Sequence, residues 1–308
     1  MSFASLCKEE LMKRKRNLIE NKALILGMIL SGAKISEAEF VFSSVNEDIS
    51  NYFVFLLKRV YQYNASVVED KIQSNKFLHT YNVSCSGSMN IMEDLEVHNF
   101  GEFKKQIEES DNLAAAYLCG AFLARGSVND PETSEYHFEI TLDNPKNATF
   151  VQHVMNTRNF NAKIIKRRNR LVLYLKEAEK IVDIIRFIGA NTQAFLYEDL
   201  RIERDFNNSI NRIINCEVAN EQKTIQAARE QLKYIKYLEY NYPLEKIDPK
   251  ILTVMKVRQD NPEASLVELM EILETEYGQK ISKPGLSHRF AKIKELAIEH
   301  NKNKKSDN

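Results

Sequence analysis

A chain of 308 residues is long enough for two or three domains, and its 43 basic and 43 acidic side chains leave no net charge to attract nucleic acid. Any such binding must therefore depend on a local cluster of basic residues. Cys7, Cys85, Cys119 and Cys216 are far apart, and the six histidines lack metal-ligand spacing, so we expect reduced thiols, no metal and no cofactor. The absence of a signal peptide and of an 18-residue apolar run predicts a cytoplasmic protein with no membrane partner.

The first half of the chain is organised around an apolar segment at residues 23–35. Ala23, Gly27 and Ser31 recur every four residues, which places three small side chains on one face of a helix. A helix that is otherwise apolar on all sides is buried, and a stripe of small residues lets another backbone approach closely. Around it the sequence predicts a helix in 1–16, a strand at 39–44, a helix at 48–63, strands at 66–73 and 76–84 joined by a turn at Ser74 and Asn75, and a short helix at 87–97.

Residues 113–130 repeat this pattern with Ala116, Gly120 and Ala124. Glycine inside a helix costs about 0.5–1 kcal/mol relative to alanine, so the matched glycines predict two central helices packed through Gly27 and Gly120. A strand at 136–141, a helix at 147–160, a hairpin of strands at 162–167 and 170–175, and a helix at 177–188 ending at Gly189 follow in the same order.

The matching order of elements predicts an α+β domain over residues 1–195. Its two pseudo-symmetric halves, about 1–97 and 111–190, would each carry helices on one face of an antiparallel sheet.

The second hairpin is strongly basic, with seven basic residues and no acidic one between positions 158 and 176. The corresponding hairpin of the first half mixes acidic residues with its lysines, so the basic surface is not symmetric. Contact with DNA phosphates and simple solvation explain the cluster equally well. The candidates for secondary DNA contacts are Lys166, Arg167, Arg168 and Arg170.

Residues 196–240 contain neither glycine nor proline and show helical periodicity. We interpret them as two connected helices of a linker that spans 196–245 and ends in the segment YNYPLEKIDP.

The remaining residues predict an all-α helix-turn-helix domain at 246–302, with a disordered tail at 303–308. Its helices are expected at 249–259, 265–277 and 283–300, and the last follows a short turn as a recognition helix does. Eight basic residues but only two acidic ones lie between positions 280 and 305. A three-helix bundle that binds a protein is the alternative. The candidate DNA-binding residues are Lys283, Ser287, His288, Arg289, Lys292 and Lys294.

The segment LCGAFLARG resembles the LAGLIDADG signature of homing endonucleases, and ILGMILSGA is its counterpart in the first copy. The resemblance implies an αββαββα fold in each half, with the glycines of the motif at Gly27 and Gly120. It also implies a metal-binding acid at the end of each motif helix, but those positions hold Gly32 and Arg125. Divalent ions in such a site are held by carboxylates, so we predict that the chain is not an enzyme and has no catalytic residues.

Over nearly its whole length the chain resembles the WhiA family of bacterial transcription regulators. The resemblance rests on YLCGAFLARGSVNDPE, YLKEAEKIVDIIRFIGA, NRIINCEVANEQKT and ISKPGLSHRFAKIKELA, although Gly32-Ala33 departs from the expected Asn-Gly. It implies a DNA-binding regulator linked to cell division or sporulation, associated with the nucleoid, whose C-terminal domain is the main DNA reader. Double-stranded promoter DNA would be its ligand, and RNA polymerase or another regulator its candidate protein partner.

The primary hypothesis is a sequence-specific DNA-binding transcription regulator without nuclease activity. In it, Ser287, His288 and Arg289 reach base edges while the neighbouring lysines hold phosphates. Its rivals are an active LAGLIDADG nuclease or RNA maturase, and a protein-interaction scaffold.

Overall fold

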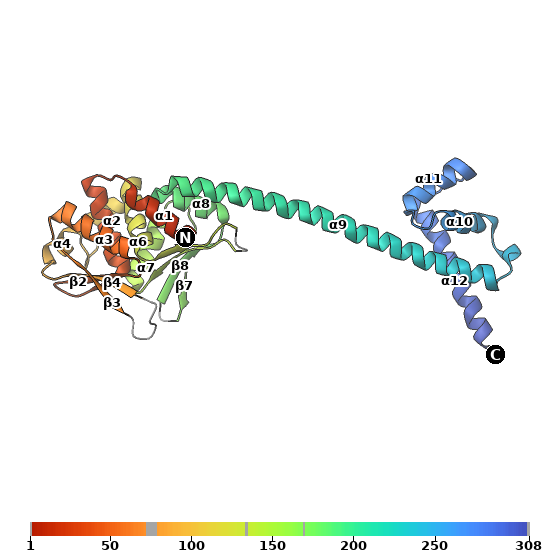
Figure 1. The fold of residues 1–308 in the computed structure, drawn as a ribbon, viewed down its shortest axis with the longest axis horizontal. Coiled ribbons are helices and arrows are strands. Elements are labelled where there is room, and N and C mark those ends of the chain that lie inside the picture. Colours follow the sequence, from red (N-terminus) through yellow and green to blue (C-terminus); the bar gives the residue numbers. More distant parts are fainter. Residues whose placement is uncertain (1, 72–78, 133–134, 169, 307–308) are drawn as a thin grey trace. The chain divides into compact units, whose positions relative to one another are not determined.

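A computed structural model describes residues 2–71, 79–132, 135–168 and 170–306 (Figure 1). The chain divides into two compact units, Met1–Asp205 and Phe206–Asn308, which we call the repeat domain and the C-terminal module.

The first half of the repeat domain follows the αββαββα order that the resemblance to homing endonucleases implies. Helix α2 begins at residue 18, five positions before the apolar segment, because Asn17 caps it. The backbone N–H of Glu20 donates to the Asn17 side-chain oxygen, and the backbone N–H of Asn17 donates to the Glu20 carboxylate. The predicted turn at Ser74 and Asn75 lies outside the described residues. The elements are α1 (Phe3–Lys13), α2 (Leu18–Gly32), β1 (Ala33–Ile35), β2 (Phe40–Ser44), α3 (Glu47–Tyr61), β3 (Val67–Lys71), β4 (His79–Cys85) and α4 (Met89–Asp94).

The second half repeats this order after an additional helix. Two short strands, β1 and its counterpart β5, directly follow the motif helices, where the sequence predicts no strand. Three residues are too few to show an alternating pattern. The elements are α5 (Glu102–Glu109), α6 (Asp111–Arg125), β5 (Gly126–Val128), β6 (Phe138–Leu142), α7 (Pro145–Asn156), β7 (Lys163–Arg167), β8 (Arg170–Leu175) and α8 (Ala178–Ile188).

The two sheets are copies of each other in topology and register. Their strand orders are β1-β2-β4-β3 and β5-β6-β8-β7, with all neighbours antiparallel. Phe40 pairs with Cys85 in the first sheet and Phe138 pairs with Leu175 in the second, and all four side chains are buried. In Figure 1 the helices of the repeat domain lie on one side of the strands, which confirms the predicted α+β arrangement.

Helices α2 and α6 pack against each other at their glycines. A Cβ atom on Gly27 would lie 2.1 Å from the Tyr117 carbonyl oxygen, and one on Gly120 would lie 2.1 Å from the Leu24 carbonyl oxygen. Real Cβ atoms do not approach backbone so closely, so both positions require glycine. The reciprocal contact confirms the predicted interface through Gly27 and Gly120.

The C-terminal module is all helical. Helix α9 (Asn191–Asn241) begins in the repeat domain and is continuous, so the prediction of two connected helices in 196–240 is wrong. Without glycine or proline, nothing in the segment interrupts the backbone hydrogen bonds. The other elements are the 3-10 turn η1 (Leu244–Lys246), α10 (Pro249–Asp260), α11 (Leu266–Tyr277) and α12 (Lys283–Ser306).

Helix α12 continues into the predicted tail at 303–308. Residues 303–306 are helical, because no proline or glycine ends the helix there, and residues 307–308 lie outside the described part of the chain. Among the described residues, no helix combines the length and apolar character needed to cross a bilayer.

Candidate nucleic-acid interface

A short turn positions α12 against α11. Helix α11 begins with a capping box between Ser265 and Glu268 and ends at Gly278, whose positive φ of 61° suits glycine. The amide of Gln279 then donates to the Leu273 carbonyl at 2.8 Å, and α12 begins four residues later. Two helices joined by so short a turn form a helix-turn-helix arrangement.

The interior of the C-terminal module contains a buried arginine. Arg258 of α10 is 1% exposed, and its Nε donates to the Gln231 Oε1 of α9 at 2.9 Å. Its Nη1 donates to the carbonyls of Asn261 and Ala264 at 3.3 and 2.5 Å. The guanidinium also lies 5.5 Å from the centroid of the Phe290 ring. Burial lowers the pKa of Arg258, and in the described residues only neutral oxygens accept its hydrogen bonds.

Helix α12 has one apolar and one exposed face. Leu286, Phe290, Ile293 and Ala297 recur every three or four residues and are buried in the core of the module. Ser287, His288 and Lys292 point away from that core and are exposed, as is Lys283 in the first turn. The exposed face of α12 is thus polar and basic. Lys292 Nζ lies 2.7 Å from the Glu295 carboxylate, and that hydrogen bond and charge raise the pKa of Lys292.

Two of the predicted DNA-binding residues lie at the flanks of this face. Arg289 is half-buried, and its Nη1 donates to the Gln279 Oε1 at 3.0 Å and to the Lys250 carbonyl at 3.5 Å. Lys294 lies over the Tyr234 ring of α9, with Nζ 5.6 Å from the ring centroid. Both side chains therefore contact their own module.

The open face of the second sheet carries a hollow of about 580 Å³ next to the basic hairpin. Two arginines of the hairpin lie near carboxylates. Arg167 Nη1 is 3.9 Å from Glu139 Oε2, and Arg170 Nε is 3.5 Å from Asp143 Oδ1. Lys166 alternates with Arg167 along β7 and so belongs to the other face. The hollow is lined by Glu139, Thr141, Arg167, Arg168, Arg170 and Val172.

The ends of the two motif helices hold no carboxylate. Gly32 is buried, and a Cβ atom there would lie 2.6 Å from the Phe42 ring and 3.0 Å from the Ala124 methyl group. Arg125 is partly buried, and this burial lowers its pKa. Lys8 of α1 has its pKa lowered to about 8, first by burial and then by the charge of Arg125. Two positive charges therefore lie near the end of α6.

Sequence reasoning missed Arg258 and Lys8. Arg258 lies among the apolar residues Val254, Met255 and Val257 of an otherwise regular helix, and that position was the available signal. Lys8 lies in a charged N-terminal segment, where a lysine is normally exposed.

Two family models match the chain in succession. The WhiA LAGLIDADG-like domain matches residues 114–207, and the WhiA C-terminal HTH domain matches residues 210–297.

Bacterial relatives match over almost the full length. The probable cell division protein WhiA of Staphylococcus aureus strains JH9 and NCTC 8325 is 36% identical, with 96% of each chain covered. A crystal structure described as "full-length DUF199/WhiA from Thermatoga maritima" is 24% identical, with 97% of this chain and 99% of that chain covered and a TM-score of 0.61. The separate N-terminal LAGLIDADG domain of DUF199/WhiA gives a TM-score of 0.52 over 61% of this chain and 90% of that chain, again at 24% identity.

Proposed function

The chain belongs to the WhiA family, and from that premise we propose that it is a sequence-specific DNA-binding transcription regulator without nuclease activity. The relatives in Staphylococcus aureus carry the name of a probable cell division protein, so we assign this regulator to cell division or to sporulation-type control. It would act in the cytoplasm on the nucleoid, with RNA polymerase or another regulator as its protein partner.

The observation that carries the proposal is the exposed face of α12 behind its helix-turn-helix turn. Ser287 and His288 lie in the N-terminal part of the helix, which enters the major groove in such modules and reaches base edges. Lys283 and Lys292 lie beside them and would bind phosphates. Because the chain has no net charge, this local surface supplies the attraction that the whole molecule lacks.

Arg289 takes a refined role in this proposal. In the free protein its hydrogen bond to Gln279 supports the turn between α11 and α12. We assign Arg289 to a base edge in the complex, where a guanine would replace Gln279 as the acceptor. Lys294, which lies over Tyr234, would reach phosphate only from the flank of the helix.

The repeat domain supplies a second, weaker DNA surface and no cleavage site. Arg167, Arg168 and Arg170 border the hollow on the open sheet face and would contact phosphates there, whereas Lys166 belongs to the other face of β7 and would add only a peripheral phosphate contact. At the motif positions, Gly32 has no space for a carboxylate and Arg125 brings a positive charge. A metal-dependent nuclease needs carboxylates there to hold divalent ions.

Genome-wide mapping of the DNA bound by the intact protein tests the proposal. We expect discrete sites in promoter regions, and a purified duplex from such a site should bind more tightly than a scrambled duplex of equal length. Incubation of that duplex with the protein and Mg²⁺ or Mn²⁺ should leave it uncut. Uniform binding across the genome would contradict the proposed sequence specificity, and specific cutting would contradict the absence of nuclease activity.

A further inference from the structure

Helix α9 carries a contiguous apolar surface that the other described elements leave open. Five large apolar side chains between positions 206 and 218 have exposed fractions between 39% and 64%. Their spacing places them on one broad side of the helix. Scattered apolar residues are ordinary on protein surfaces, but a contiguous patch marks an interaction site. We call this set the α9 stripe; it consists of Phe206, Ile210, Ile213, Ile214 and Val218.

The stripe continues the helix face on which the C-terminal module is built. From Ile213, steps of three or four residues lead through Glu217, Glu221 and Thr224 to Ala228, Gln231, Ile235 and Leu238. Ala228, Ile235 and Leu238 are fully buried, and Ile235 and Leu238 share one core with α10, α11 and α12. One face of α9 is therefore covered by helices in its C-terminal part and uncovered at the stripe.

Helix α12 is an amphipathic helix that packs in the same core as the C-terminal part of α9. It belongs to the core that includes Ile235 and Leu238 through its apolar residues Leu286, Phe290 and Ile293. At the edge of that contact, the ammonium group of Lys294 lies over the Tyr234 ring of α9. An amphipathic helix with a lysine on its flank is thus already packed against the C-terminal part of α9.

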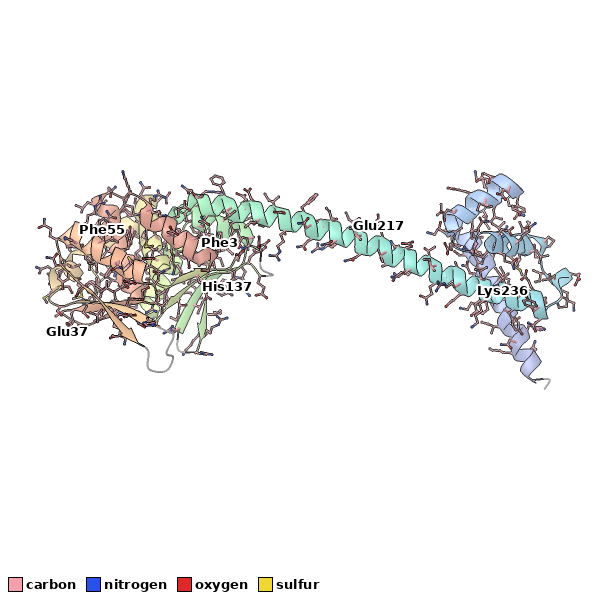
Figure 2. The ribbon with its side chains drawn as sticks, in the orientation of Figure 1. Phe3, Glu37, Phe55, His137, Glu217 and Lys236 are labelled. Atoms are coloured by element: carbon pink, nitrogen blue, oxygen red, sulfur yellow. The ribbon has the colours of Figure 1, made fainter. Side chains whose placement is uncertain are left out.

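The charges around the stripe are acidic. Glu217 and Glu221 are exposed and lie on the stripe side of α9, and Glu217 marks this stretch in Figure 2. Between residues 206 and 221 the single basic residue is Arg212, which is two positions from both Ile210 and Ile214 and so projects from the opposite side. A helix bound along the stripe would therefore meet carboxylates and no positive charge.

This charge pattern argues against a second copy of the chain as the occupant. Two α9 helices in parallel register would place Glu217 against Glu217 and Glu221 against Glu221. In an antiparallel pair centred on the stripe, Glu221 would face Glu203, again a like charge. Neither arrangement offers a basic group to these carboxylates.

We infer that the α9 stripe is the docking site for an amphipathic helix of another protein whose apolar face ends in lysine or arginine. The apolar side of the partner helix covers Phe206, Ile210 and Ile213, and the basic residues at the end of that face pair with Glu217 and Glu221. The stripe spans 13 residues, or about 20 Å of helix at 1.5 Å per residue, which fits a short partner helix and a reversible complex. This inference goes beyond DNA binding and does not depend on it.

The full-length protein can be tested with two synthetic 18-residue helices that share an apolar face and carry either lysines or glutamates at one end of that face. We expect fluorescence anisotropy to show at least tenfold tighter binding of the lysine peptide, with an affinity that falls as salt is raised. Ile213→Asn should abolish binding, while Arg212→Asn, on the opposite side of the same turn, should not. The double variant Glu217→Lys, Glu221→Lys should reverse the peptide preference, and Glu230→Lys should leave it unchanged.

Cys216 gives an independent readout, because it is the exposed cysteine three residues after Ile213 while Cys7, Cys85 and Cys119 are buried. A lysine peptide whose terminal cysteine is activated as a mixed disulfide with thionitrobenzoate should exchange with Cys216, forming a protein–peptide disulfide and releasing thionitrobenzoate, and Ile213→Asn should suppress this exchange. Equal binding of both peptides, or unchanged binding by the Ile213 variant, would overturn the inference. Sedimentation as a dimer that Ile213→Asn converts to a monomer would also overturn it, because a second copy would then be the occupant. DNA binding by the same variants should be unchanged, which separates this failure from failure of the proposed function.

Discussion

The repeat domain and the C-terminal module fill their interiors in opposite ways. At the centre of the repeat domain, Gly27 and Gly120 bring two backbones together so closely that even a methyl group does not fit. At the centre of the module lies Arg258, the largest fully buried side chain among the described residues, with its charge surrounded by neutral oxygens and an aromatic ring. The interior of the repeat domain depends on the absence of side chains at two positions, and the interior of the module depends on hydrogen bonds to one buried polar side chain.

The basic surfaces of the two units also differ in how their cations are paired with carboxylates. On the open sheet face of the repeat domain, Arg167 and Arg170 lie near Glu139 and Asp143. On α12, Lys292 is likewise paired, with Glu295, whereas Lys283 makes no ion pair with the described residues. A cation that is not already paired can contact a ligand without losing an internal partner, so Lys283 favours the module as the DNA reader and the repeat domain as a scaffold.

The largest effect is expected from Gly120→Val, which should unfold or loosen the repeat domain. Overpacking typically costs about 1–3 kcal/mol, and a Cβ atom 2.1 Å from the Leu24 carbonyl oxygen places this change at or above the upper end. Thermal unfolding followed by circular dichroism measures the effect.

Alanine at the same position is the sharper control. Replacing a helical glycine by alanine normally stabilises by about 0.5–1 kcal/mol, but Gly120→Ala should destabilise. Gly285→Ala in α12, where the nearest side-chain atom is 3.1 Å away on Ile281, should not. A stabilised Gly120→Ala protein would mean that α2 and α6 do not pack at their glycines.

Arg258→Met should destabilise the C-terminal module by about 1–3 kcal/mol, because it leaves the oxygens of Gln231 and Ala264 buried without a donor. Hydrogen exchange resolved along the chain should show faster exchange in α10, α11 and α12 and unchanged exchange in α2 and α6. Equal loss of protection in α2 and α6 would contradict the division into two independent interiors.

The sequence predicts the repeat domain better than the site, for a physical reason. A repeated glycine on an apolar helix face has few explanations other than close packing, so Gly27 and Gly120 were identified from the sequence. The role of Arg289 could not be read in this way, because its partners Gln279 and Lys250 are brought to it only by the turn. The burial of Lys8 depends likewise on how α1 packs, which no local pattern encodes.

A smaller effect of opposite sign is expected at Lys8, whose folded-state pKa of about 8 lies below the usual lysine value of 10.5. Below pH 8 both the folded and the unfolded chain bind the proton, and the folded state carries the full cost of the buried charge. Between pH 8 and 10.5 the unfolded chain binds more protons, so this contribution to stability rises with pH. Lys8→Met should therefore stabilise the repeat domain at pH 7, by on the order of 1 kcal/mol, and the difference should shrink between pH 8 and 10.5. Thermal unfolding at pH 7 and pH 10 measures it, and a Lys8→Met protein less stable than wild type at pH 7 would contradict the proposed cost of burial.

The last expected effects concern DNA affinity, not stability, and decide which unit reads DNA. If α12 binds as proposed, Lys292→Ala should weaken binding about threefold to tenfold on every sequence and lower the salt slope by about one contact, since a phosphate contact releases counterions without reading a base. His288→Ala should weaken binding to the preferred site more than to a scrambled duplex, because a base contact is worth about 1–3 kcal/mol of discrimination.

Arg289→Ala should reduce discrimination between the two duplexes. It should also speed hydrogen exchange in the turn between α11 and α12, because the hydrogen bond from Arg289 to Gln279 is lost. A triple alanine variant at Arg167, Arg168 and Arg170 serves as the counterpart in the repeat domain and should change affinity by less than the module variants. Titration of all four proteins against both duplexes at two salt concentrations separates the outcomes. If the hairpin variant abolishes binding while the α12 variants bind like wild type, the repeat domain is the reader and the assignment of the module is wrong.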